Sequence, residues 1–184
     1  MQLMVPSADL TVTASADTIG TSMPVDLFVS ISSPIDSISG LAFRIQLDTA
    51  LVKINQTTID YVGTVFGTPG VDLIKIDRVI ANNGTIEVGL SRNDHTNISG
   101  TGQVVRIGIV TTDNVSGKVT LYADPIDIDG VTAAGVQEVL SPLGATVTID
   151  PAYTGVISIE NQASMSVAPV PSKGFLAVTL NDVS

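Results

Sequence analysis

Residues 41–48 read Leu-Ala-Phe-Arg-Ile-Gln-Leu-Asp, the clearest alternation of side chains in this 184-residue chain. Large apolar residues occupy the odd positions, and smaller or polar residues occupy the even ones. Because successive side chains of a β-strand point to opposite faces, this stretch predicts a long strand with one buried face.

The same period of two recurs on both sides of that strand. Asn82-Asn83-Gly84-Thr85 separates two such runs and favours a hairpin, since Asn-Gly accepts the backbone of a type I′ turn. No 3.6-residue pattern is long enough to predict a helix. The sequence therefore predicts an all-β fold, an antiparallel two-sheet β-sandwich of about nine strands. Its predicted core comprises Leu27, Val29, Leu41, Phe43, Ile45, Leu47, Val88, Leu90, Val105, Ile107 and Ile109.

Composition limits both the domain organisation and the partners. The length suits one domain with a tail, and a change of composition after Asp150 predicts a domain over residues 1–150 and a separate segment over residues 151–184. There is no cysteine, so disulfides and thiolate chemistry are excluded. A net charge of −10 would repel nucleic acid or an anionic membrane surface. No apolar run approaches the ~18 residues of a membrane span, so no membrane insertion is expected.

The residues needed for catalysis are scarce. His95 is the only histidine, and it lies in a polar loop, whereas a Ser/His/Asp site needs a histidine held between a nucleophile and an acid. The lack of cysteine and of further histidines also argues against a zinc site. We therefore expect no enzyme activity and no cofactor.

A weak calcium candidate is formed by Asp124, Asp127 and Asp129, which are followed by Gly130. A calcium-binding loop with glycine at its sixth position needs acidic first and twelfth residues, and these positions hold Pro125 and Val136. An acidic strand end followed by a turn is the favoured interpretation, and a looser surface calcium site is the alternative.

Three stretches resemble a known family. The first runs from 25–29 through 38–48 to the short apolar run 51–54, the second is the hairpin return strand 84–92, and the third is the glycine-led strand 99–109. In this order and spacing they are similar to the cohesins, the receptor half of the cohesin–dockerin pair that assembles cellulosomes and related cell-surface complexes. The resemblance covers about residues 9–150. It implies a jelly-roll sandwich, shared with several carbohydrate-binding modules.

The resemblance also implies a binding face. In cohesins the partner docks on a flat sheet face, whose strands correspond here to 40–48, 72–81, 84–91 and 103–110. The best-known cohesins place Asn and Asp at the positions of Gly40 and Ala42, which this chain lacks. The implied partner is a dockerin-like module or a cell-surface protein. The candidate partner-binding residues on these strands are Arg44, Gln46, Lys75, Asp77, Glu87 and Arg106.

The tail carries a second resemblance. Residues 166–180 are similar to the opening of the C-terminal sorting domain of Bacteroidetes type IX secretion, with Ala168 in place of the usual aromatic residue and Val170 in place of Asn. This implies a secreted bacterial protein with an extracellular or cell-surface location.

Two other functions stay open. A carbohydrate-binding module of the same sandwich superfamily, acting in polysaccharide degradation, would be favoured by exposure of Tyr61, Phe66 or Tyr122, because sugars stack on aromatic faces. A structural spacer domain of an adhesin would be favoured by a sheet surface without an exposed patch.

Overall fold

A computed structural model describes residues 8–153, 165–166 and 179–180. The chain divides into two compact units, Met1–Tyr153 and Thr154–Ser184. In the second unit, the described residues form one short antiparallel pair, β13 (Met165–Ser166) with β14 (Thr179–Leu180). The rest of the stretch that resembles a sorting domain lies outside the described residues.

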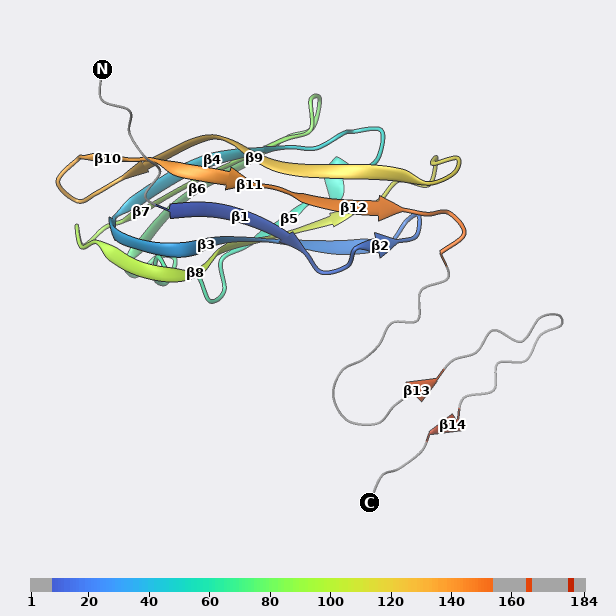
Figure 1. The fold of residues 1–184 in the computed structure, drawn as a ribbon, viewed down its shortest axis with the longest axis horizontal. Helices are drawn as coiled ribbons and strands as arrows, with labels where there is room; N and C mark the ends of the chain where they lie inside the picture. Colours follow the sequence, from blue (N-terminus) through green and yellow to red (C-terminus); the bar gives the residue numbers. More distant parts are fainter. Residues whose placement is uncertain (1–7, 154–164, 167–178, 181–184) are drawn as a thin grey trace, which may run out of the picture. The chain divides into compact units, whose positions relative to one another are not determined.

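The first unit is a sandwich of two β-sheets (Figure 1). One sheet has five strands in the order β11-β1-β3-β8-β5, and the other has seven in the order β2-β12-β9-β4-β7-β6, with β10 paired to β9. A 3-10 helix, η1, covers Ile54–Gln56. The strands are β1 (Ala8–Ala14), β2 (Thr18–Ile19), β3 (Pro24–Ile38), β4 (Gly40–Gln46), β5 (Thr58–Asp60), β6 (Leu73–Ile80), β7 (Thr85–Arg92), β8 (Ile98–Val110), β9 (Val119–Val131), β10 (Gln137–Glu138), β11 (Leu140–Leu143) and β12 (Ala145–Ile149).

The predicted all-β, two-sheet sandwich is confirmed, but its strands are not all antiparallel. β1 runs parallel to β11, and β2 runs parallel to β12. Hairpins enforce antiparallel pairing only between strands that are close in sequence, whereas these partners come from opposite ends of the domain. Within the described residues, no helix is both long and apolar enough to cross a bilayer.

The core lies between the two sheets and contains every residue predicted for it, each at most 4% exposed. On one side, β4 pairs with β7 so that Phe43 stands opposite Val88. On the other side, β3 pairs with β8 so that Leu27 stands opposite Ile107. The alternation in these strands therefore identified the buried faces correctly, because each strand has one face on the core and one toward solvent.

β9 is longer than the sequence pattern indicates. The segment from Asp124 to Asp129 was expected to end a strand and turn, yet it lies inside β9. The pairing of β9 with β4 shifts register between Ala42 and Arg44, and Asp127 adopts a φ of 50° there. This β-bulge absorbs extra residues, so the strand continues past a sequence that resembles a turn.

Truncation of Phe43 tests the assignment of the core face. Phe43 is 2% exposed, so Phe43→Ala is expected to lower the free energy of unfolding by about 3–5 kcal/mol in urea denaturation. The control is Ala42→Ser on the exposed side of the same strand, with an expected change within about 0.5 kcal/mol. A loss below about 1 kcal/mol for Phe43→Ala would contradict the burial.

Candidate functional site

The outer face of β9, β4, β7 and β6 is built from rows of residues that lie side by side across the strands. We define this outer face by four rows. Two apolar rows are Val131–Gly40–Ser91–Ile74 and Asp129–Ala42–Gly89–Ile76, a charged row is Ile126–Arg44–Glu87–Arg78, and a fourth row is Asp124–Gln46–Thr85–Ile80. Three of the sequence-predicted site residues, Arg44, Gln46 and Glu87, are brought together on this face.

The arginines of the charged row form ion pairs with Glu87 of the same row and with the neighbouring Asp127. Arg44 Nε donates to Glu87 Oε1 at 3.0 Å, and Arg44 Nη1 donates to Asp127 Oδ2 at 2.7 Å. Arg78 Nη2 donates to the second oxygen of Glu87 at 2.6 Å. The hydrogen bond from Arg78, helped by the charges of both arginines, holds the pKa of Glu87 below its ordinary value. Each arginine of the row therefore already has a carboxylate partner.

The two apolar rows leave large side chains uncovered. Ile76 is 73% exposed and Ile74 is 54% exposed, and both lie on β6, the edge strand of the sheet. Their neighbours toward β4 are small: Gly89 has no side chain, and Ala42 contributes only a methyl group. The result is a shallow hollow of about 260 Å³ over these rows, continuous through Ala42, Gly89 and Ile76 with one of about 530 Å³ above the charged row.

Lys75 and Asp77 lie on the opposite side of β6 from the one expected. They stand opposite Leu90 and Val88, two core residues of β7, so they point to the inner side of the sheet. Tyr61 contacts both Lys75 and Asp77 on that side. Its hydroxyl lies 3.2 Å from Asp77 Oδ2, and Lys75 Nζ lies 4.6 Å from the centre of its ring. Burial, followed by the charge of Asp77, raises the pKa of Tyr61.

The expectation for β6 failed because both of its faces are partly apolar in sequence. Ile74 and Ile76 make the more hydrophobic set, and the expected outward position of Lys75 and Asp77 implied that the isoleucines faced inward. β6 is the last strand of its sheet, so its inner side lies at the rim of the sandwich, where charged groups reach solvent. Arg78 accordingly lies on the outer face, and the sequence reading missed it together with the two isoleucines.

Arg106 lies in the other sheet. β8 pairs with β3 and β5, and Arg106 Nη2 donates to Asp60 Oδ2 on β5 at 2.7 Å. The resemblance had assigned the strand 103–110 to the docking face, and alternation could not correct this, because it tells which side of a strand is buried but not to which sheet the strand belongs. The fourth strand of the outer face is β9 instead.

The three aspartates of β9 do not form a calcium site. Asp127 is paired with Arg44, and Asp129 Oδ1 accepts a hydrogen bond from Gln137 Nε2 at 3.0 Å. In the described part of the chain, no three acidic or histidine side chains gather in a way that could hold a metal ion. His95 is exposed in the turn that follows β7.

The charged row can be tested by titration. We expect the carboxyl of Glu87 to titrate below the ordinary range of glutamate in ¹³C NMR, and Arg78→Ala to raise its pKa more than Arg44→Ala does. A depressed folded-state pKa stabilises the fold above the unfolded-state value, and this contribution is lost as the pH falls through the folded-state value. Arg106→Ala is the control and should leave the titration of Glu87 unchanged. An ordinary pKa in the wild type would contradict the pairing.

The fold of this chain can be compared with those of known proteins. No family model matches the sequence, and no curated protein matches it. A type I cohesin from Clostridium thermocellum, solved in a complex with a dockerin, superimposes with a TM-score of 0.62 and 14% identity, over 77% of this chain and 99% of that one.

Two further cohesins are similar to the same extent. A type II cohesin domain from the cellulosome of Acetivibrio cellulolyticus gives a TM-score of 0.61 at 13% identity, over 78% of this chain and 95% of that one. The cohesin module of a Clostridium perfringens family 33 glycoside hydrolase gives 0.60 at 9% identity, over 79% and 98%. These likenesses establish the fold, and residues 8–153 form a cohesin-like β-sandwich domain.

Proposed function

We propose that the domain is a non-catalytic protein-binding module that docks a dockerin-type partner on its outer face. The observation that carries the proposal is the exposure of Ile74 and Ile76 over a floor of Gly89 and Ala42. Burying one such side chain at an interface stabilises a complex by about 1.5–3 kcal/mol. The exposed isoleucines can therefore contribute substantially to the affinity for a partner. Contiguous exposed apolar surface on a soluble domain commonly marks an interaction site.

The fold supports this choice of partner. The Clostridium thermocellum cohesin that shares the fold was solved with a dockerin bound. The resemblance seen in the sequence assigns docking to the face that carries residues 40–48, and β4 lies in the middle of the outer face. An extracellular or cell-surface location of a secreted bacterial protein belongs to the same proposal.

The charged row has a different part in docking from the apolar rows. Its arginines are already bonded to Glu87 and Asp127, so a partner gains little by offering them a new carboxylate. The row instead presents fixed donors and acceptors at one end of the apolar surface. Affinity should then depend mainly on the isoleucines, and orientation on the charged row.

Ile76→Glu tests the docking face. The variant is expected to lose at least about tenfold in affinity for dockerin modules encoded in the source genome, measured by isothermal titration, because it places a charge in an apolar contact. Val62→Glu is the matched control, since Val62 is 78% exposed in the segment that follows β5. Equal binding by both variants, with unchanged melting temperatures, would show that the partner docks elsewhere.

One observation favours a second function, carbohydrate binding. Tyr61 and Phe66 are 4% and 0% exposed, which removes them as stacking platforms, but Tyr122 on β9 is 60% exposed. It borders a hollow of about 540 Å³ with Gln46 and Asn83. The Gln46 amide is already bonded to Asn83 O and Thr85 Oγ1, so a sugar would be held mainly by the ring of Tyr122. The exposed isoleucines in turn argue against a purely structural spacer.

Tyr122→Ala tests that second function. If the domain binds polysaccharide through this hollow, the wild type is retarded in affinity gels that contain soluble polysaccharides and the variant is not. Ile76→Glu should leave such retardation intact, because Ile76 lies outside the hollow. No retardation of the wild type by any polysaccharide would remove this function.

A further inference from the structure

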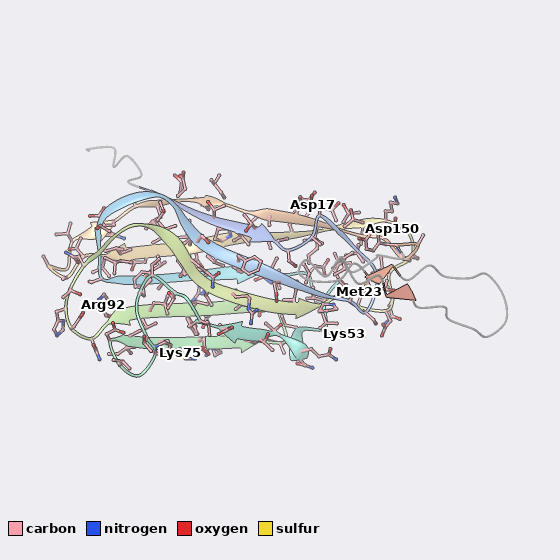
Figure 2. The ribbon with its side chains drawn as sticks, turned by 90° about the horizontal axis from the view of Figure 1, so that it is seen from below. Asp17, Met23, Lys53, Lys75, Arg92 and Asp150 are labelled. Atoms are coloured by element: carbon pink, nitrogen blue, oxygen red, sulfur yellow. The ribbon has the colours of Figure 1, made fainter. Side chains whose placement is uncertain are left out.

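The outer edge of β6 carries backbone groups that point away from its own sheet. β6 ends the seven-stranded sheet, and Figure 2 shows Lys75 at the lower edge of the domain. Asn93 N donates to Asp72 O on the β7 side, whereas Leu73 O accepts from Gly70 N on the opposite side. Backbone direction alternates along a strand, so Lys75, Asp77 and Val79 direct their N–H and C=O groups outward from the sheet. Among the described residues, β6 pairs with β7 alone, apart from a bridge between Pro69 and Leu73.

We propose that this edge pairs with β6 of a second copy of the chain, antiparallel about a twofold axis at Ile76. Two seven-stranded sheets would then continue into one another. In this register Lys75 stands opposite Asp77 of the second copy, and the reciprocal pair forms by symmetry. Both are residues with outward backbone groups, so each pair exchanges two ladder hydrogen bonds. On the outer side, Ile76 meets its own symmetry mate, and part of its exposed surface is buried.

The charges along β6 select this register over its neighbours. Only registers that match outward-directed residues with one another can form the ladder. Moving the axis to Asp77 would place two aspartates opposite each other, and moving it to Arg78 would place two arginines opposite each other, which is unfavourable. Leu73 already bonds to the turn at Gly70, so in the proposed register Val79 of the second copy, which stands opposite Leu73, stays outside the ladder, and the ladder consists of the two Lys75–Asp77 pairs. Moving the axis toward Leu73 would bring that turn into the ladder itself.

The charged pair is also held in place before association. Lys75 Nζ lies 2.9 Å from Asp77 Oδ2 in the same chain, and the ring of Tyr61 supports both groups. Because both charges already have a partner in their own chain, the second copy gains little net energy from them, and they act mainly by selecting the register, while the backbone ladder and Ile76 supply the attraction. The ladder is short, so the dimer should be weak and depend on concentration. This inference does not rest on the docking function, since the ladder is formed by Lys75 and Asp77. The two proposals share only Ile76, so a docked partner and a second copy would compete for part of its surface.

A charge exchange tests the proposal. Lys75→Asp sets two acidic residues opposite each other in the dimer, and Asp77→Lys sets two lysines opposite each other, so each variant alone is expected to sediment as a monomer. An equimolar mixture of the two variants restores opposite charges at both pairs and is expected to sediment as a heterodimer. The wild type should dimerise as its concentration rises to about 1 mM in sedimentation velocity. Arg106→Glu, a charge reversal on the other sheet, is the control and should dimerise like the wild type.

Three outcomes would overturn the proposal: a wild type that stays monomeric over this range, single variants that dimerise like the wild type, or folded variants whose mixture stays monomeric. If either variant fails to fold, amide hydrogen exchange of the wild type decides. The amides of Lys75 and Asp77 should gain protection with concentration, whereas that of Ile76, which is directed at β7, should not. Equal behaviour of all three amides would contradict the ladder.

Discussion

The register of β4 against β7 positions both the core and the outer face. It sets Phe43 opposite Val88 inside, and in the same step it sets Ala42 beside Gly89 and Arg44 beside Glu87 outside. A slip by one residue would turn every one of these side chains to the other face. The buried side chains contribute about 1.5–3 kcal/mol each, whereas exposed ion pairs contribute about 0–1 kcal/mol. The core therefore fixes the register, and the surface rows follow from it.

Because the core sets the register, the outer face can combine a charged row whose charges are balanced with exposed isoleucines. Neither is needed to hold the sheet together, so the surface is free to serve a partner. The charges of the row, Arg44, Arg78 and Glu87, cancel with that of the neighbouring Asp127, which makes this part of a strongly acidic protein locally neutral. A partner that approaches it meets little repulsion and an apolar surface that costs little to desolvate.

Sequence patterns predicted the parts of the structure in which one face of a strand is much more apolar than the other. β4, β7 and β8 are of this kind, and each predicted core residue in them is buried. β6 also alternates, with Ile74 and Ile76 against Lys75 and Asp77, but its faces were assigned the wrong way round, because at the rim charged side chains can lie on the inner side and still reach solvent. The sheet that receives β8, and therefore the position of Arg106, depends on contacts between strands distant in sequence. The bulge at Asp127 was hidden for the same reason, since a local reading of acidic residues and Gly130 indicates a turn.

The floor of the hollow between the isoleucines and β4 can be altered separately from the fold. A Cβ added at Gly89 would meet Ile76 atoms no closer than 3.7 Å, an ordinary contact, and its backbone does not require glycine. Gly40 differs, because a Cβ there would approach a methyl group of Val131 at 3.2 Å. A methyl group can therefore be added at Gly89 with little strain, but at Gly40 only if the Val131 side chain shifts. A side chain at Gly89 would thus reshape the hollow and leave the sandwich as it is.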